Sequence, residues 1–155
     1  MNRLQTYLLY FFFSVGLCAW TFRESLLRAS EQKAPDQKSG NSMQIERGKY
    51  LVEEVAKCAE CHTPRDGAGN LRGEAWLQGA PIWIMPVAHI PNWADQTPPL
   101  AGLPSFTHTQ MERVLEKGVG PEGEVLRPPM HTYHMHADDA RAIIAYLESL
   151  TPSHR

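Results

Sequence analysis

Three stretches of the chain repeat apolar residues at the spacing of an α-helix. They cover residues 42–58, 107–118 and 137–150. In each, apolar side chains recur three or four positions apart and so share one helix face. These positions are Ile45, Leu51, Val52, Val55, Met111, Val114, Leu115, Ile143, Ile144, Leu147 and Leu150. The pattern therefore predicts three helices in this part of the chain.

Residues at the helix ends support the second and third of these helices. Thr107 and Gln110 match a capping box, and Gly118 suits a C-terminal stop. Asp138 and Asp139 lie in the first turn of the third helix, where carboxylates favour the positive end of the helix dipole.

Gly48 interrupts the first helical pattern. A glycine inside a helix is less favourable than alanine by roughly 1 kcal/mol. We therefore expect a second helix to cross the first one closely at this position.

The segment between the first and second helices is long and rich in proline. It covers more than forty residues, seven of them proline. Such a long irregular loop is uncommon in a compact domain. It is reasonable if the loop wraps a large apolar ligand, which would then bury Trp76, Ile82, Trp83, Ile84, Met85 and Trp93.

The N-terminal end of the chain has a different character. Residues 4–22 carry no charge and are flanked by arginines. About 17–25 apolar residues cross a bilayer, so residues 1–23 are predicted to be an uncleaved membrane anchor. A cleaved signal peptide is the main alternative, and a buried soluble helix is another. Residues 24–42 are mostly polar and predict a flexible linker, which leaves 43–155 as the globular domain.

The charge of the domain limits its partners. Residues 43–155 contain ten Lys or Arg against fourteen Asp or Glu, which leaves a formal net charge of −4 with histidine neutral. A nucleic-acid-binding domain would carry a basic patch or stripe. No nucleic-acid partner is therefore expected.

Cys58, Cys61 and His62 form the strongest chemical motif in the chain. Positions i, i+3 and i+4 of a helix project from one face. Two thiols can then add to the two vinyl groups of a haem, while the neighbouring imidazole reaches the iron. This Cys-x-x-Cys-His spacing is the attachment signature of haem c. The motif occurs once, which predicts one haem c bound through two thioethers.

A zinc site and a dithiol redox pair are the alternatives for this motif. Structural zinc needs four ligands, and the remaining cysteine, Cys18, lies in the apolar N-terminal segment. His131, His134 and His136 could complete a zinc site, but they have no carboxylate or thiol neighbour. We expect them to be solvated or locally hydrogen-bonded. A thioredoxin-like pair would require a βαβ setting, which the pattern does not show.

Residues 44–151 resemble a class I monohaem c-type cytochrome. The similarity is carried by RGKYLVEEVAKCAECHT at the start, RPPM before the last segment and DDARAIIAYLESL at the end. It implies the all-α cytochrome c fold with about three main helices, in which the first and last helices cross beside the haem edge and a long proline-rich loop wraps the cofactor. Gly48 would then lie against the last helix near Ile143 and Tyr146.

The resemblance also implies the sixth iron ligand. In the family this ligand is a methionine in a loop shortly before the last helix. Met130 occupies the corresponding place in RPPMHTYHM, with His131 where proline is usual and two stiffening prolines before it. Met135 is the rival. The expected iron ligands are His62 and Met130.

The function that the resemblance implies is single-electron transfer without catalysis by this chain. Ligation by histidine and methionine fills both axial positions and leaves no open site for a substrate. The expected partners are a redox donor and acceptor, with a dehydrogenase or terminal oxidase as candidates. The expected location is the periplasmic face of the inner membrane, or the periplasm if the N-terminal segment is cleaved. The alternatives are a cytochrome subunit of a dehydrogenase or oxidase complex, and a ligand-binding haem sensor in which Met130 is labile.

Overall fold

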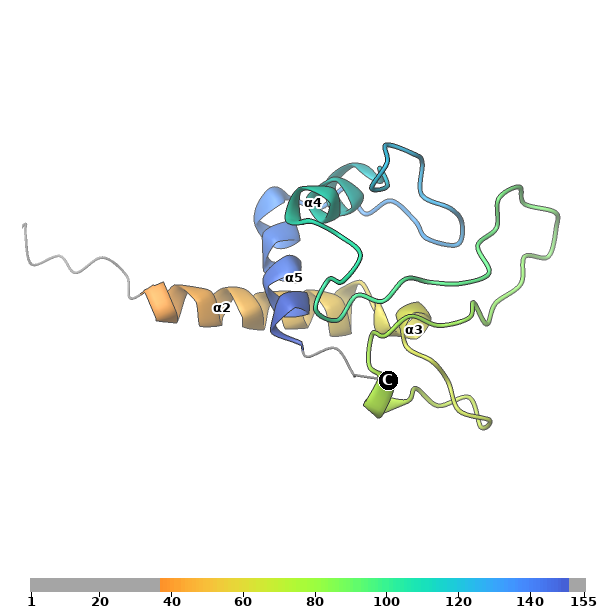
Figure 1. The fold of residues 1–155 in the computed structure, drawn as a ribbon, viewed down its shortest axis with the longest axis horizontal. Helices are drawn as coiled ribbons and strands as arrows, with labels where there is room; N and C mark the ends of the chain where they lie inside the picture. Colours follow the sequence, from red (N-terminus) through yellow and green to blue (C-terminus); the bar gives the residue numbers. More distant parts are fainter. Residues whose placement is uncertain (1–36, 151–155) are drawn as a thin grey trace, which may run out of the picture. The chain divides into compact units, whose positions relative to one another are not determined.

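The computed structural model describes residues 37–150, which form helices and irregular segments. The elements are α2 (Gln37–Tyr50), a π-helical turn η1 (Leu51–Val55), α3 (Ala59–His62), a 3₁₀ turn η2 (Gly73–Ala75), α4 (His108–Lys117) and α5 (Ala137–Ser149). This part of the chain holds no strand, but it has three isolated β-bridges. The all-α prediction is therefore confirmed (Figure 1).

The predicted anchor and most of the predicted linker lie outside the described residues. Within residues 37–150, none of the helices is long and apolar enough to cross a membrane.

Helices α2 and α5 cross at Gly48, as the mid-helix glycine predicted (Figure 1). A Cβ atom at this position would lie 1.9 Å from the carbonyl oxygen of Ala142 and 2.8 Å from Cβ of Tyr146. Only glycine therefore permits the observed approach of the two helices. Beside the crossing, Arg47 Nε lies 3.0 Å from Asp139 Oδ1.

The first helix differs from its prediction at both ends. It begins at Gln37 rather than Ser42, and it ends in the π-helical turn η1 rather than continuing to Cys58. Lys57 adopts a left-handed backbone with φ +52°, which interrupts the helix. Its carbonyl then accepts a hydrogen bond from the backbone N–H of Glu60 and opens the next turn. The cysteine motif therefore stands on a short helix of its own.

Helices α4 and α5 agree closely with the sequence pattern. The Thr107 hydroxyl accepts from the backbone N–H of Gln110, and the Gln110 side chain accepts from the backbone N–H of Thr107. Gly118 ends α4 in the left-handed conformation, with φ +65°. Leu150 lies beyond α5 and is only partly buried, unlike the rest of the predicted stripe. The two helices pack on each other and enclose a core of Leu51, Val52, Ala59, Leu77, Leu100, Ala101, Leu103, Met111, Val114, Leu115, Ala140, Ala142, Ile143, Ile144, Tyr146 and Leu147.

The long loop between α3 and α4 is held to the core at Leu77, whose side chain is fully buried. The backbone N–H of Leu77 donates to the hydroxyl of the buried Thr63 at 2.9 Å. Its carbonyl accepts from the N–H groups of Leu100 and Ala101. These bonds satisfy buried backbone groups that regular structure would otherwise pair. The loop is thus fixed at both ends of its excursion from the helices.

Candidate functional site

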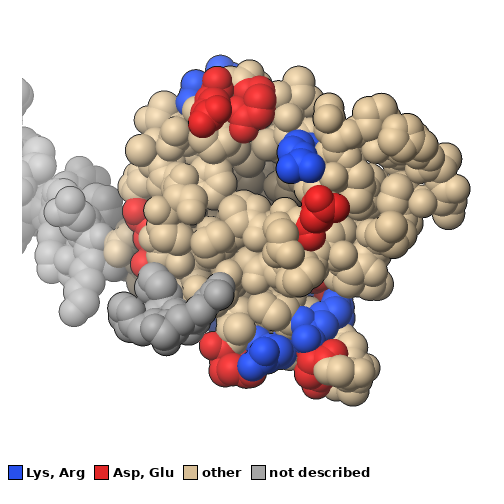
Figure 2. Space-filling model, turned by 45° about the vertical axis from the view of Figure 1, so that its right-hand side comes forward, with Lys and Arg blue, Asp and Glu red and all other residues tan. Residues whose placement is uncertain are grey.

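One cavity of about 540 Å³ opens beside the Cys-x-x-Cys-His turn. It lies within the size range of cofactor sites. The side chains on its floor are apolar and come from α4, α5 and the loop before α4, namely Leu100, Phe106, Met111, Val114, Leu115, Ile143 and Leu147. The space-filling view shows a hollow in this face of the molecule, with a few charged side chains near it and mostly uncharged residues around (Figure 2). A large, mainly apolar group would fit this cavity.

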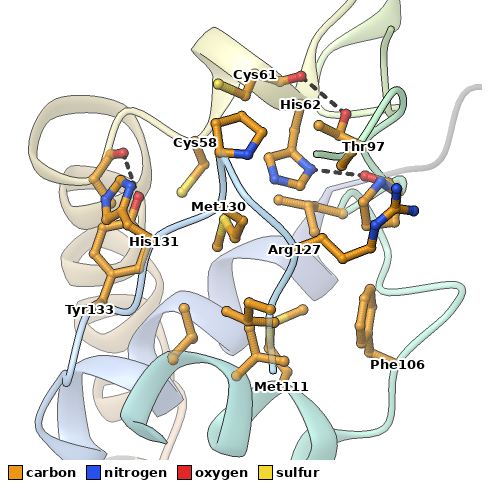
Figure 3. A pocket seen from close by; sticks show the side chains of 18 of the residues that line it. Cys58, Cys61, His62, Thr97, Phe106, Met111, Arg127, Met130, His131 and Tyr133 are labelled. Atoms are coloured by element: carbon orange, nitrogen blue, oxygen red, sulfur yellow. Dashed lines mark hydrogen bonds between the residues drawn. The ribbon is translucent and has the colours of Figure 1, made fainter. Parts of the chain in front are cut away.

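The three motif residues reach the cavity from one helical turn, as their spacing predicted. The N–H groups of Cys61 and His62 both donate to the carbonyl of Cys58, at 3.3 and 2.9 Å. Cys58, Cys61 and His62 all line the cavity (Figure 3). Cys58 and Cys61 are not joined in a disulfide. Helical spacing has therefore brought two thiols and one imidazole to the same wall.

The environment keeps both cysteines as neutral thiols. Burial raises the pKa of Cys58 to about 11, and burial also raises the pKa of Cys61. Reactive dithiols have the opposite property, a lowered pKa in an electropositive setting. This chemistry disfavours the dithiol alternative.

His62 is buried and held in one orientation by the loop. Its Nδ1–H donates to the carbonyl of Pro98 at 2.9 Å, which leaves Nε2 as the nitrogen free to ligate a metal. Burial lowers the pKa of the imidazole, because a charged ring would lose its hydration. The ring is therefore a neutral ligand directed into the cavity (Figure 3).

Thr97 connects the motif to the loop that carries Pro98. Its hydroxyl donates to the Cys61 carbonyl at 3.0 Å and accepts from the Ala80 N–H at 2.9 Å (Figure 3). The Gly79 N–H donates to the His62 carbonyl at 2.9 Å. No local pattern in the sequence connects Thr97 or Pro98 to the motif, because they lie more than thirty positions from it.

Three methionines lie near the cavity or its core, and they differ in position. Met130, in the loop before α5, lines the cavity together with His62. Met111 on α4 also lines it, but its side chain is buried within the core. Met135 packs against the core and is absent from the lining. The structure thus separates Met130 from Met135 and adds Met111, which the helical pattern indicates only as a core residue.

Polar groups capable of binding carboxylates stand at one side of the cavity. Arg127 lines it and donates to the carbonyls of Asn92 and Trp93, at 3.1 and 2.9 Å. The indole N–H of Trp93 is buried and finds no hydrogen-bond partner among the described residues. Its neighbour Ala94 forms part of the lining. Trp93 itself does not line the cavity, so Arg127 is the group here that fits a ligand carrying carboxylates.

Most of the loop side chains expected to surround the ligand lie elsewhere, so that prediction was wrong. Of the six residues named, Ile82 alone lines the cavity. Trp76 packs against the core, and Met85 is exposed to solvent. Trp83 lies outside because its indole N–H donates to the Glu60 carbonyl at 2.9 Å. Apolar character alone did not distinguish a cavity wall from an exposed loop.

Two of the three histidines after Met130, His131 and His136, make local contacts. The His131 ring lies 4.3 Å from the Tyr133 ring, centroid to centroid, and His131 lines the cavity. The His136 side chain caps α5 by accepting from the N–H of Asp138. Residues 37–150 contain no group of three His, Cys, Asp or Glu side chains placed to hold a metal ion. The histidines are therefore not gathered with the cysteines in the way a zinc site requires.

Residues 43–147 match the family model described as cytochrome c oxidase, cbb3-type, subunit III. This match covers most of the chain and includes the cysteine motif, the cavity and Met130. The chain belongs to this cytochrome c family. The described domain is therefore a c-type cytochrome domain, and members of this family carry covalent haem c for electron transfer.

Individual relatives agree with this membership. The chain is 32% identical over 111 residues to the fructose dehydrogenase cytochrome subunit of Gluconobacter japonicus, covering 67% of this chain and 21% of that protein. It is 31% identical over 109 residues to a diheme cytochrome c-type of Cereibacter sphaeroides, covering 66% and 34%. It is 31% identical over 123 residues to the cytochrome c subunit of a quinone alcohol dehydrogenase of Gluconacetobacter polyoxogenes, covering 73% and 26%. The chain thus spans between 21% and 34% of these relatives' length.

The residues at the cavity fit a covalent haem c. Cys58 and Cys61 would hold it through thioethers, and His62 would ligate its iron through Nε2. The Arg127 guanidinium, which lines the cavity, offers donors for its carboxylates. Tyr133, which also lines the cavity, donates to the Ala56 carbonyl at 3.0 Å and ties the loop after Met130 to the segment before the motif.

Proposed function

We propose that this protein carries single electrons with one covalently bound haem c, ligated by His62 and Met130. The observation that carries the proposal is the lining of a single cavity by Cys58, Cys61, His62 and Met130. The motif occurs once in the chain, which supports a single haem. Haem c supplies a one-electron couple of ferrous and ferric iron.

The chain's own residues affect this redox couple by orienting an iron ligand and by stabilising the reduced state. His62 is presented as a neutral, oriented ligand because Pro98 accepts its Nδ1–H. The mainly apolar floor of the cavity excludes water and favours the less charged, reduced state. A thioether ligand from Met130 would add to this preference, because neutral sulfur favours ferrous iron. Both axial positions would then be filled, which supports electron transfer rather than substrate binding.

Met130 is preferred over the other methionines for a structural reason. Met130 stands on an irregular loop, where its side chain reaches the cavity without disturbing a helix. Met111 contributes to the packing of α4 in the core, and Met135 does not line the cavity. Ligation by Met130 would therefore leave the packing of α4 and α5 unchanged.

Absorption spectra of the purified full chain test this assignment. The oxidised protein should show the far-red band of methionine-ligated iron. Met130→Ala should abolish the band and admit carbon monoxide or imidazole, because it opens one axial position. Met111→Leu and Met135→Ala should retain the band and lower stability alone. Because Met135 is only partly buried, the loss for its alanine variant should be smaller than the roughly 2–5 kcal/mol typical of a fully buried methionine. An intact band in folded Met130→Ala would reject the assignment.

The partners and location follow from the same proposal. Relatives include cytochrome subunits of dehydrogenases that act on fructose and on alcohols. This favours a dehydrogenase or a terminal oxidase as redox partner, with subunit membership as the second candidate function. Stable co-purification with a catalytic chain would distinguish a subunit from a free carrier.

Residues 1–23 would hold the domain on the periplasmic face of the inner membrane. Protease added to spheroplasts should then remove the haem domain and spare the N-terminal segment. A soluble mature protein that starts near residue 20–30 would establish a cleaved signal peptide instead.

A further inference from the structure

The loop between Pro81 and Trp93 exposes apolar side chains that no described part of the chain covers. We call Trp83, Met85, Val87 and Ile90 the apolar tip. Their exposed fractions are 57%, 83%, 109% and 40%. No Asp, Glu, Lys or Arg occurs from Ala75 to Ala94, although charged residues are frequent elsewhere in the domain. Exposed apolar surface of this kind marks an interaction site when it is continuous. The loop projects away from the helices (Figure 1).

The apolar tip stands directly beside the cysteine motif. The Trp83 indole N–H donates to the carbonyl of Glu60, which lies between Cys58 and Cys61. The Arg65 guanidinium stacks over the same indole at 4.5 Å. Both ends of the loop reach the cavity, because Ile82 and Ala94 line it. A molecule seated on the apolar tip would therefore lie next to the site of haem attachment.

Resting on the electron-transfer function proposed above, we infer that the apolar tip is the docking surface for a redox protein whose own docking face is uncharged and apolar. Charged residues are depleted in the centre of protein interfaces, and weak redox encounters use small contact areas. A short uncharged loop beside the cofactor site meets both conditions. Electrons would pass across this contact.

The backbone of the loop favours a protein over a lipid bilayer. Between Trp83 and Pro91, no backbone N–H or C=O bonds to another residue that the structure describes. In hydrocarbon such groups would lose their water without replacement. At a protein interface they can bond to the partner or to trapped water. The loop is thus well suited to a hydrated protein–protein interface and poorly suited to insertion into a membrane.

The test uses the full holo-protein reconstituted in phosphatidylcholine nanodiscs. The probe is a blue-copper protein whose copper site lies beneath an uncharged apolar face, and stopped-flow absorption follows its reduction by the ferrous haem. Met85→Asp should lower the second-order rate constant at least about tenfold, because docking would bury an unpaired carboxylate. Val87→Asp repeats the test at a second exposed position.

Met43→Asp is the matched control, since it makes the same substitution at an exposed methionine on α2 and changes the net charge equally. Its rate constant should stay within about twofold of wild type. Reduction by ascorbate should be alike in all variants, because this small molecule needs no docking surface. The wild-type rate should change less than about twofold between about 0.05 and 0.5 M salt, since screening acts on charged pairs.

Equal rates for Met85→Asp and Met43→Asp, or a steep salt dependence of the wild-type rate, would overturn the docking surface. A spin label at Val87→Cys, in a Cys18→Ser background, tests the lipid alternative in the same nanodiscs. Collisions with oxygen exceeding those with a water-soluble nickel complex would place the apolar tip in lipid and would also overturn the inference. None of these results alters the ligand bands, so failure of the docking surface is distinguishable from failure of the electron-transfer proposal.

Discussion

Replacing Gly48 by alanine should destabilise the protein, although alanine is the better helix former. The added Cβ would lie 1.9 Å from the Ala142 carbonyl oxygen and 2.6 Å from its carbonyl carbon. Ordinary van der Waals contact begins at about 3.4 Å, so α2 and α5 would have to separate by about 1.5 Å at the crossing. Both obstructing atoms belong to the backbone of α5, which cannot turn away as a side chain could.

The magnitude follows from two opposed effects. Helix propensity favours alanine by about 1 kcal/mol, and overpacking of a close contact costs about 1–3 kcal/mol or more. Because the contact at Gly48 is much closer than a typical overpacked site, the upper part of that range applies. The net loss in the free energy of unfolding should therefore be about 2 kcal/mol.

Gly40→Ala provides the control within the same helix. A Cβ at Gly40 would meet no atom within 4 Å, so only the propensity effect remains. This variant should gain about 0.8–1 kcal/mol. Guanidinium chloride titrations of the full holo-protein, followed by haem absorption, measure both free energies. If Gly48→Ala is as stable as Gly40→Ala, the helix crossing does not require glycine and the reasoning is refuted.

Three further predictions concern the site. Haem should migrate with the wild-type chain in a denaturing gel, because thioethers survive denaturation. The double variant Cys58→Ala, Cys61→Ala should show no haem on the chain. A colourless wild-type band would contradict covalent attachment. Burial raises the pKa of Tyr133 to about 12, so as pH rises from about 10 towards 12 the unfolded phenol ionises first and stability falls. Chemical denaturation should show that Tyr133→Phe loses less stability than the wild type between pH 9 and 11. Equal losses in the two proteins would contradict this expectation. Thr97→Val should lower the free energy of unfolding by about 1–3 kcal/mol, because it leaves the Ala80 N–H and the Cys61 carbonyl without their partner. Thr97→Ser keeps the hydroxyl and should retain most of the stability. Equal denaturation midpoints for Thr97→Val and the wild type would show that the hydroxyl is not needed.

Features with short-range causes were predictable from the chain alone. The capping box of Thr107 and Gln110 and the stop at Gly118 depend on residues within one helix, and the structure has both. Cys58, Cys61 and His62 share a cavity wall because one helical turn places them there. Local geometry acts the same way in every fold that contains such a turn.

Long-range partners were not predictable, because no spacing rule connects them. The Pro98 carbonyl that orients His62 lies 36 positions away, and the Thr97 hydroxyl that holds Cys61 is equally distant. Met111 lines the cavity only because α4 happens to form its floor. The position of each group depends on how the long loop returns to the core, and no local pattern encodes that path.

The sequence by itself determined the second and third helices and the Cys-x-x-Cys-His turn, since propensity and capping act over a few positions. The mid-helix Gly48 indicated that another helix crosses there, and the family resemblance indicated which helix it is. Only the tertiary structure decided that the helix breaks at Lys57 and that the apolar loop points Trp83 outwards instead of into the cavity. An apolar residue can be buried in a core, a cofactor cavity or a partner interface at similar gain in free energy. Which of these it finds depends on the surfaces that the fold brings within reach, and those exist only once the chain has packed.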